Sequence, residues 1–271
     1  MLVKSVSMFV VMSLLVPLCA VKAQETRPAF HWPAGKRVAV SLSFDDARAS
    51  QIDVGLPLFD RYGAKVTFYV NPPNMENRLE GWKKAAAKGY EIGNHSRSHP
   101  CTGNFTWSRK NDVEDYTMAR MALEMDSANA ETERMLGVKP VTFAYPCGQK
   151  FIGRGEETKS YVPLVAKRFL AGRGFRDEAA NAPAFCDLAQ LLAVQSDGMS
   201  FEQMKDAVLT AQQEGAWLVF AGHEIGSPAY QTTEAAVLEQ FLKYAKDPAN
   251  GIWLDTVEAV AKYIQTQRPK P

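Results

Sequence analysis

Apolar and polar positions follow two alternating patterns along the chain. Short runs of β-branched and other apolar residues are typical of buried strands. They occupy residues 37–44, 65–70, 90–93, 141–145, 191–195, 217–220 and 252–254. Longer segments with apolar residues every three or four positions predict helices. These cover residues 51–62, 78–88, 112–136, 161–169, 200–214, 238–245 and 257–264. The alternation predicts a parallel α/β sheet, either open or closed into a barrel.

Local signals refine three of these segments. Pro57 lies inside the first predicted helix and predicts a kink there. Ser200 and Gln203 have the spacing of a capping box at the start of another helix. The stretch 149–157 is rich in glycine and predicts a loop over the functional end of the sheet.

The first 23 residues have the composition of a secretory signal peptide. Lys4 precedes an apolar run over residues 6–18, and a small residue follows at the cleavage position. The run is too short for a stable membrane span, and an uncleaved N-terminal anchor or a lipid anchor at Cys19 is the alternative. We therefore expect an exported protein, periplasmic or extracellular, in which residues 24–271 form one catalytic domain.

Size and charge narrow the possible partners. A chain of 271 residues suits one large α/β domain. Its 31 basic residues nearly balance its 30 acidic ones. Loss of residues 1–23 would remove two lysines and no acid, which changes the formal charge from +1 to −1. This balance gives no basic patch for nucleic acid. We expect a monomer with no nucleic-acid partner and no membrane span in its mature form.

Three cysteines remain after the predicted cleavage, namely Cys101, Cys147 and Cys186. An odd number leaves at least one thiol free or one bridge between chains. In an oxidising compartment a Cys101–Cys147 disulfide is conceivable. Three unpaired cysteines that act as small hydrophobic residues fit the sequence equally well.

Residues suited to metal chemistry follow three of the predicted strands. Asp45 and Asp46 end the first strand, His95 and His99 follow the third, and His223 follows the sixth. In a barrel the carboxyl ends of the strands surround the active site. One carboxylate and two imidazoles make a site for Zn²⁺, with Co²⁺, Ni²⁺ or Mn²⁺ as alternatives. The remaining aspartate and histidine are what a hydrolase needs as base and acid.

Each of these residues also has an ordinary structural explanation. A single histidine is often a hydrogen-bonded core or surface residue, and Asp46 is in position to cap the next helix. Adjacent strand residues point to opposite faces, so Asp45 and Asp46 can share one site only if the strand ends at one of them. The coincidence of all five residues with strand ends favours the metal site.

The two strongest motifs resemble those of the polysaccharide deacetylases, carbohydrate esterase family four. Residues 43–46, Ser-Phe-Asp-Asp, are similar to the first motif of that family. Residues 95–99, His-Ser-Arg-Ser-His, are similar to its second motif. The segments 65–70 and 88–94 also resemble the family, and the resemblance extends over residues 37–264.

This resemblance implies both a fold and a reaction. The fold would be a distorted (β/α)₇ barrel. The enzyme would be a secreted hydrolase that removes N-acetyl groups from a glycan. Asp46, His95 and His99 would hold a divalent metal ion, most simply Zn²⁺, Asp45 would be the general base, and His223 the general acid.

The third motif departs from the family pattern. It is usually Arg-x-Pro-Tyr but falls on residues 144–147, Ala-Tyr-Pro-Cys, so the arginine that normally steadies the base is missing. Arg173 is a candidate to supply the charge from a neighbouring strand, and a structural or surface ion pair is its alternative role. The backbone N–H of Cys147 is the expected oxyanion donor.

The last two motifs are also altered. The fourth, Asp with Trp, has no clear match, and Asp197 is a candidate by position only, with a turn or a helix cap as its alternative role. The fifth, Leu-x-His, falls on residues 221–223, Ala-Gly-His, which implies a wider acyl pocket. The next residue, Glu224, is expected to face solvent.

Substrate and reaction retain alternatives. Candidate sugar-stacking aromatics are Trp82, Trp107, Tyr116 and Tyr230, although core packing is the common role of such residues. The same site would serve an esterase that acts on O-acetylated glycan. The altered third motif is also compatible with a catalytically silent glycan-binding descendant.

Overall fold

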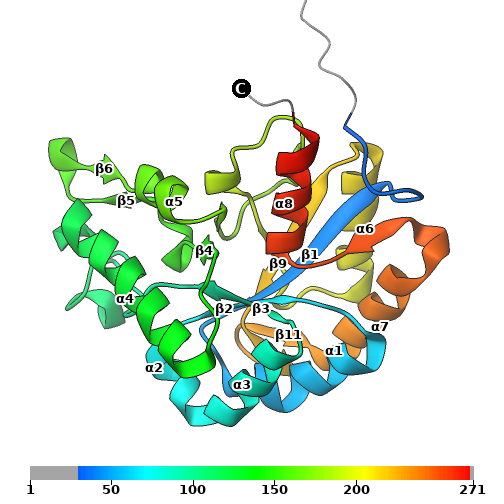
Figure 1. Ribbon diagram of the computed structural model, residues 1–271, viewed down its shortest axis with the longest axis horizontal. Helices are drawn as coiled ribbons and strands as arrows, with labels where there is room; N and C mark the ends of the chain where they lie inside the picture. Colours follow the sequence, from blue (N-terminus) through cyan, green and yellow to red (C-terminus); the bar gives the residue numbers. More distant parts are fainter. Residues whose placement is uncertain (1–29, 269–271) are drawn as a thin grey trace, which may run out of the picture.

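The alternating pattern folds into a curled parallel sheet surrounded by helices (Figure 1). The computed structural model describes residues 30–268, so the predicted signal peptide lies outside the described residues. The strands of the sheet are β1 (Val38–Asp45), β2 (Thr67–Val70), β3 (Glu91–Asn94), β4 (Thr142–Ala144), β7 (Ala171–Arg173), β8 (Val194–Gln195), β9 (Trp217–Gly222) and β12 (Ile252–Leu254). Their order is β7-β4-β3-β2-β1-β9-β8, and β12 pairs with the start of β1.

One backbone pairing brings the two edges of this sheet together. Arg173, the last residue of β7, pairs in parallel with Leu191. The chain then continues into β8, which lies beside β9. The segment 191–195, predicted as one strand, therefore pairs with β7 at its start and with β9 at its end. The sheet forms a distorted half-barrel.

Helices cover the outside of the sheet (Figure 1). They are α1 (Leu56–Tyr62), α2 (Pro72–Met75), α3 (Leu79–Ala87), α4 (Met118–Leu136), α5 (Val162–Arg168), α6 (Phe201–Gln213), α7 (Ala235–Lys246) and α8 (Val257–Gln267). Two further strand pairs lie outside the sheet, β5 (Phe151–Ile152) with β6 (Lys159–Ser160) and β10 (Glu224–Gly226) with β11 (Thr232–Glu234). Among residues 30–268 no helix has the length and apolar character needed to cross a membrane.

The residues of β1 show how the sequence pattern orients the site. Val40, Leu42 and Phe44 are buried in the core between the sheet and its outer helices. Successive side chains of a strand point to opposite faces, so Ser43 and Asp45 face the interior of the curled sheet. Ser43 is buried there and donates a hydrogen bond to a carbonyl of β9. The alternation thus delivers Asp45 to the carboxyl end of the barrel interior.

Some predicted boundaries are wrong for local reasons. The helix expected over 112–136 begins at Met118, because Thr117 caps it and a separate 3₁₀ turn, Val113–Asp115, precedes it. The predicted loop 149–157 contains β5, which pairs with β6. The first predicted helix starts as a π-helical turn and becomes α1 just before Pro57.

Candidate active site

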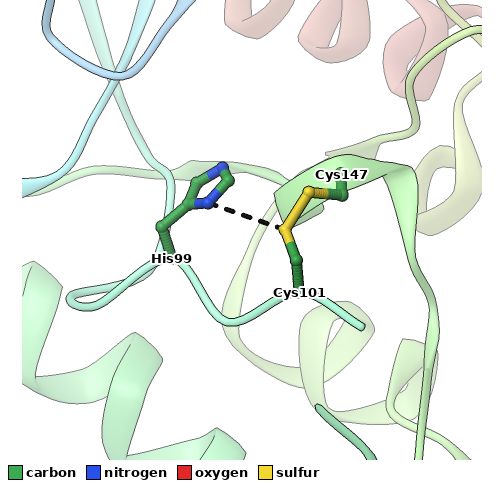
Figure 2. A group of neighbouring side chains, drawn as sticks. All are labelled: His99, Cys101 and Cys147. Carbon is green, nitrogen blue, oxygen red and sulfur yellow. Dashed lines mark hydrogen bonds between the residues drawn. A yellow bond between two sulfur atoms is a disulfide. The ribbon is translucent and has the colours of Figure 1, made fainter. Parts of the chain in front are cut away.

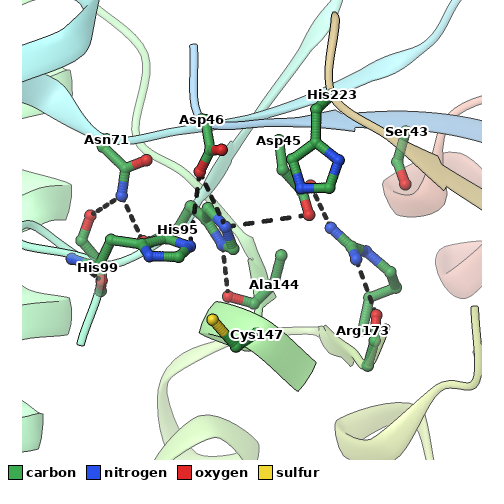
Figure 3. A network of polar contacts seen from close by, with 12 residues as sticks. Ser43, Asp45, Asp46, Asn71, His95, His99, Ala144, Cys147, Arg173 and His223 are labelled. Atoms are coloured by element: carbon green, nitrogen blue, oxygen red, sulfur yellow. Dashed lines mark hydrogen bonds and ion pairs between the residues drawn. The ribbon is translucent and has the colours of Figure 1, made fainter. Parts of the chain in front are cut away.

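A cavity of about 480 Å³ opens at the carboxyl ends of the central strands. The predicted catalytic and metal-binding residues that line it are Asp45, Asp46, His95, His99, Cys147 and His223. Figure 3 shows these side chains converging from β1, the loop after β3, the turn after β4 and the end of β9. The remaining predicted residue, Arg173, is fully buried and contacts Asp45 from the inside of the barrel.

The backbone after β1 allows both aspartates to face this cavity. The strand ends at Asp45, and the next two residues, Asp46 and Ala47, have φ values of 74° and 51°. This left-handed conformation is uncommon for residues other than glycine and costs roughly 1–2 kcal/mol per residue. It turns the chain so that Asp46 points toward the histidines, although it follows Asp45 directly.

The three proposed metal ligands lie close together. The Oδ1 atom of Asp46 is 3.5 Å from the Nε2 atoms of both His95 and His99 (Figure 3). The Nδ1 atom of His95 donates to the carbonyl oxygen of Ala144 at 2.9 Å. This bond assigns the proton to Nδ1 and leaves Nε2 to face Asp46, which is the usual arrangement around a histidine ligand.

This donor set fits a divalent metal ion. Metal–ligand bonds of about 2.0–2.2 Å place neighbouring donors roughly 3–3.5 Å apart, and the contacts above have that spacing. Burial, and next His95, lower the pKa of His99 to about 4. Burial opposes ionisation of Asp46, but the two histidines lower its pKa. A neutral imidazole and an ionised carboxylate are the forms that bind a metal ion.

Asp45 is held by a buried arginine. Arg173 on β7 is fully buried, and its Nη2 donates to Oδ1 of Asp45, while its Nη1 donates to the Gly174 carbonyl at 2.7 Å. The ring of Tyr69 lies 4.8 Å from the guanidinium carbon. Burial raises the pKa of Asp45, but the charge and hydrogen bond of Arg173, together with His95 and His223, outweigh burial and hold the pKa at about 2. Asp45 is therefore ionised at neutral pH.

Asp46 has its own cationic partner outside the barrel. Its Oδ2 atom accepts a hydrogen bond from Nη2 of Arg48 at 3.0 Å. Glu224, expected to face solvent, has a side chain that is 35% exposed. It also accepts a hydrogen bond from Ser50 and lies 3.8 Å from Arg48, so its carboxylate helps to fix Arg48 at the cavity edge.

Asp197 contacts His223. The Nδ1 atom of His223 donates to Oδ2 of Asp197 at 2.6 Å, and the backbone N–H of His223 donates to Oδ1 at 3.0 Å. Thr233 on β11 donates to the same Oδ1 at 3.2 Å. Burial lowers the pKa of His223, but the bond to Asp197 and nearby carboxylates outweigh it, so the pKa is raised.

Two buried amides that sequence reasoning missed fix the strand ends. The Nε2 atom of Gln51 donates to the carbonyl oxygens of Asp45 and His223, at 2.6 and 2.9 Å. The Nδ2 atom of Asn71 donates to the carbonyl oxygen of His95 at 2.6 Å and to that of the next residue at 3.0 Å. The one available signal was their position: Gln51 lies six residues after Asp45, and Asn71 comes immediately after β2.

A disulfide joins the loop of the histidine pair to the turn after β4. Cys101 and Cys147 are bonded, with their Cα atoms 6.0 Å apart, while Cys186 is free. Figure 2 shows the sulfur of Cys101 facing Nδ1 of His99, at 3.6 Å. A carbonyl or carboxylate usually accepts the hydrogen bond from that nitrogen in a metal-bound histidine. Here the sulfur of Cys101 lies where that acceptor would be.

The aromatic candidates divide into two groups. Trp82 and Tyr116 are 0% and 4% exposed, so the prediction that they stack on sugars is wrong. Trp107 and Tyr230 are 63% and 84% exposed and line the cavity. The ring of Phe105 stacks on Trp107 with the two centroids 5.5 Å apart, which gives the cavity a flat aromatic wall.

The curled sheet and the cavity at its carboxyl end define a deacetylase-type α/β barrel. A protein from Mycobacterium smegmatis assigned as a polysaccharide deacetylase is similar, with a TM-score of 0.65, 16% identity, and 90% of this chain and 96% of that chain covered. Puue allantoinase gives a TM-score of 0.66 at 17% identity, with 91% and 96% covered. A family 4 acetyl xylan esterase from Clostridium thermocellum, in complex with a cobalt ion, gives a TM-score of 0.55 at 17% identity. The match covers 85% of this chain and 93% of that chain. At such identities the likeness establishes the fold alone.

Sequence comparison finds similarity to the same family over part of the chain. The sequence model described as polysaccharide deacetylase matches residues 33–159. An uncharacterized protein of Bacillus subtilis (strain 168), YlxY, is 34% identical over 93 residues, and a gellan lyase of Bacillus sp is 27% identical over 241 residues. These alignments cover 34% and 87% of this chain but 26% and 9% of those longer proteins. Residues 33–159 thus match the model of the same family that the first two motifs resemble.

Proposed function

We propose that this protein is a metal-dependent hydrolase that removes N-acetyl groups from a glycan. The observation that carries the proposal is the convergence of three metal-type donors, Asp46, His95 and His99, with an ionised Asp45 and a hydrogen-bonded His223 in one cavity. The match of residues 33–159 to the polysaccharide deacetylase model supports hydrolysis of carbohydrate acetyl groups. A binding protein would have no need of a base and an acid on either side of a metal site.

The proposed cofactor is a divalent ion held by Asp46, His95 and His99. Two imidazoles and one carboxylate favour Zn²⁺, and Co²⁺, Ni²⁺ and Mn²⁺ are alternatives. The cobalt ion in the similar xylan esterase is compatible with this choice. When bound, such an ion polarises the acetyl carbonyl and lowers the pKa of an adjacent water.

Asp45 is the proposed general base. Its Oδ2 atom is 3.9 Å from Nε2 of His95, so the carboxylate faces the space beside the proposed metal ligands. Arg173 keeps it ionised, and it can take a proton from the water that attacks the acetyl carbon. The backbone N–H of Cys147 is the proposed donor to the oxyanion, in a turn where φ is 53°.

His223 is the proposed general acid. An amine leaves an amide as a strong base, so the C–N bond breaks readily when the nitrogen gains a proton as it departs. His223 can donate that proton from Nε2 because Asp197 holds Nδ1 and raises the pKa of the ring. The proton taken by Asp45 replaces the one that His223 gives up, and the products are acetate and a glycan amine.

A second candidate is acetyl-ester hydrolysis on an O-acetylated glycan. The similar fold of an acetyl xylan esterase favours it, and the same base and metal ligands would serve both reactions. The leaving group of an ester is an alcohol oxygen, which departs with less protonation by an acid than an amine nitrogen needs. Removal of the His223 imidazole would therefore harm amide hydrolysis more than ester hydrolysis.

The test is acetate release from a panel of N-acetylated and O-acetylated glycans. We expect the Zn²⁺- or Co²⁺-loaded protein to release acetate from N-acetylated glycans, and the chelator-treated protein to lose this activity until metal is restored. Equal release before and after removal of metal would contradict the metal-dependent mechanism. Release from O-acetylated glycans alone would favour the esterase.

We also propose that the protein acts outside the cytoplasm. The predicted signal peptide in residues 1–23 supports this location, and so does the Cys101–Cys147 disulfide, because such bonds are rare in reducing compartments. Cell fractionation of the full-length protein tests it: recovery in the cytoplasmic fraction with residues 1–23 intact would contradict export.

A further inference from the structure

The cavity wall beside His223 carries a cation that the proposed reaction does not use. Arg176 lines the cavity and is exposed to solvent. Its Nε atom donates to the side-chain amide oxygen of Gln195 at 2.8 Å, and its guanidinium carbon lies 5.2 Å from the ring centre of Phe175. Within residues 30–268 its charge has no carboxylate partner at ion-pair distance. A neutral amide and a ring orient this guanidinium and leave its outer N–H groups free of an anion.

The other charges of the cavity wall are already paired. The acidic side chains that line it are Asp45 and Asp46, and the lining arginines are Arg48 and Arg176. Asp45 is paired with Arg173, and Asp46 with Arg48. Arg176 is therefore the lining cation whose charge remains for a ligand, and a metal ion at the proposed site would add to the positive potential.

The backbone at Arg176 is unfavourable for any side chain. Its φ is 60°, in the left-handed region that glycine adopts at no steric cost. Four other cavity residues have such backbones; Asp46, His99 and Cys147 carry proposed roles in the reaction, and Gln231 does not. Strained residues of this kind concentrate at ligand sites, where the side chain is needed despite its cost. At position 176 a glycine would relieve the backbone but would remove the cation.

The position of Arg176 indicates which part of a substrate it meets. The neighbouring ring of Phe175 packs edge-on against His223, with centroids 5.3 Å apart. His223 is the proposed donor to the departing amine, so this wall faces the sugar that keeps the nitrogen. The stacked rings of Phe105 and Trp107 lie beside the proposed metal ligands, with the ring centres of Trp107 and His99 6.1 Å apart.

We propose, on the basis of the proposed deacetylase function, that the substrate is an acidic glycan whose carboxylate is bound by Arg176. A planar guanidinium matches a carboxylate with two parallel hydrogen bonds, which a sugar hydroxyl cannot accept in the same way. Two sources have this chemistry: a uronic acid linked to the N-acetylated sugar, and a lactyl ether on that sugar itself. Their carboxylates differ in distance from the acetamide, so both belong in the test.

The experiment compares three N-acetylated oligosaccharides of similar length with Zn²⁺-loaded protein. One is a neutral N-acetylglucosamine oligomer, the second alternates N-acetylglucosamine with glucuronic acid, and the third is a peptide-free glycan strand with lactyl carboxylates. We expect kcat/KM to be higher on one of the two acidic glycans. Arg176→Gln should lower the ratio of acidic to neutral kcat/KM roughly 10- to 100-fold, chiefly through KM, because one charged hydrogen-bonded contact is lost. High salt should reduce the same ratio.

Two variants serve as controls. Arg134→Gln removes an exposed arginine from the surface of α4 and should leave the ratio as it is. Arg176→Lys keeps the charge without the fork and should fall between wild type and Arg176→Gln. Equal or better turnover of the neutral glycan, with no change of ratio in Arg176→Gln, would overturn the inference and leave the deacetylase proposal standing. Failure to release acetate from all three glycans would instead reject the deacetylase activity, and this inference with it.

Discussion

The guanidinium of Arg173, on β7, forms a fully buried ion pair with the carboxylate of Asp45, on β1. The two residues are 128 positions apart in sequence, and they lie on strands that are not neighbours in the sheet. The arginine thus reaches the proposed base through the interior of the barrel.

Loss of this arginine should damage both stability and activity. Arg173→Met leaves Asp45 buried without its cation, so we expect the pKa of Asp45 to rise and the free energy of unfolding to fall by about 3–5 kcal/mol. Urea unfolding and kcat measure the two effects. Arg168→Met, which breaks a surface ion pair with Asp126, is the matched control and should cost less than about 1 kcal/mol. Similar losses in both variants would contradict the special role of Arg173.

The proposed base can be separated from the metal site by a conservative change. Asp45→Asn keeps the shape of the side chain but cannot accept a proton, so kcat should fall roughly 10²- to 10⁴-fold. Because Asp46, His95 and His99 are retained, the bound metal measured by atomic absorption should stay near one ion per chain. Near-normal turnover in Asp45→Asn would show that another group removes the proton.

Metal binding should stabilise the fold through the two histidines. An ion that binds the native state alone adds about 2.7 kcal/mol to the unfolding free energy at a hundred times its Kd. Zn²⁺ should therefore raise Tm of the wild type but not of His95→Ala. His31→Ala, at an exposed site outside the cavity lining, should keep the full shift. A shift that survives in His95→Ala would place the ion elsewhere.

The partner of His223 should set the alkaline limit of activity. The raised pKa of His223 keeps its acid form present to higher pH, and its stabilising pair with Asp197 is lost as pH rises through that pKa. Asp197→Asn removes the charge, so the alkaline limb of the kcat profile should move to lower pH by roughly 1–3 units. Asp206→Asn, on the exposed face of α6, is the control. An unmoved limb in Asp197→Asn would mean that a different group is the acid.

The disulfide should support the metal site as well as the fold. Opening the Cys101–Cys147 bond frees a loop with a sequence separation of 46. In the chain-entropy model this costs about 4 kcal/mol of stability. Because the sulfur of Cys101 contacts His99, we also expect the Cys101→Ala/Cys147→Ala variant to bind Zn²⁺ more weakly in a competition titration. Cys186→Ala, which removes the free thiol, should lower neither the stability nor the Zn²⁺ affinity. Equal Zn²⁺ affinity in all three proteins would show that the disulfide does not support the metal site.

Periodic patterns in the sequence predicted most of the sheet and its helices. The apolar runs identified β1, β2 and β9 because buried parallel strands need nearly continuous hydrophobic residues. Short elements escaped, such as β7 (Ala171–Arg173), whose three residues include a glycine and an arginine. A strand of that length owes its existence to its neighbours in the sheet, and its own composition carries little signal.

The site was predictable where residue type alone limits the chemistry. Paired aspartates and spaced histidines at strand ends are informative because few roles need them. Asp197 carried no such signal, since its contact with His223 depends on β8 lying beside β9. The left-handed turn at Asp46 was equally hidden, because alternation along a strand would send adjacent side chains to opposite faces.

The placement of the guanidinium on β7 affects how enzymes of this kind are found in genomes. A search that requires an arginine at the third-motif position would reject this chain and classify it as an inactive descendant. A filter that asks whether any cation touches Asp45 in three dimensions would retain it. Relatives that carry this arginine on a different strand would then be grouped by the contacts around the proposed base, whatever the order of their motifs.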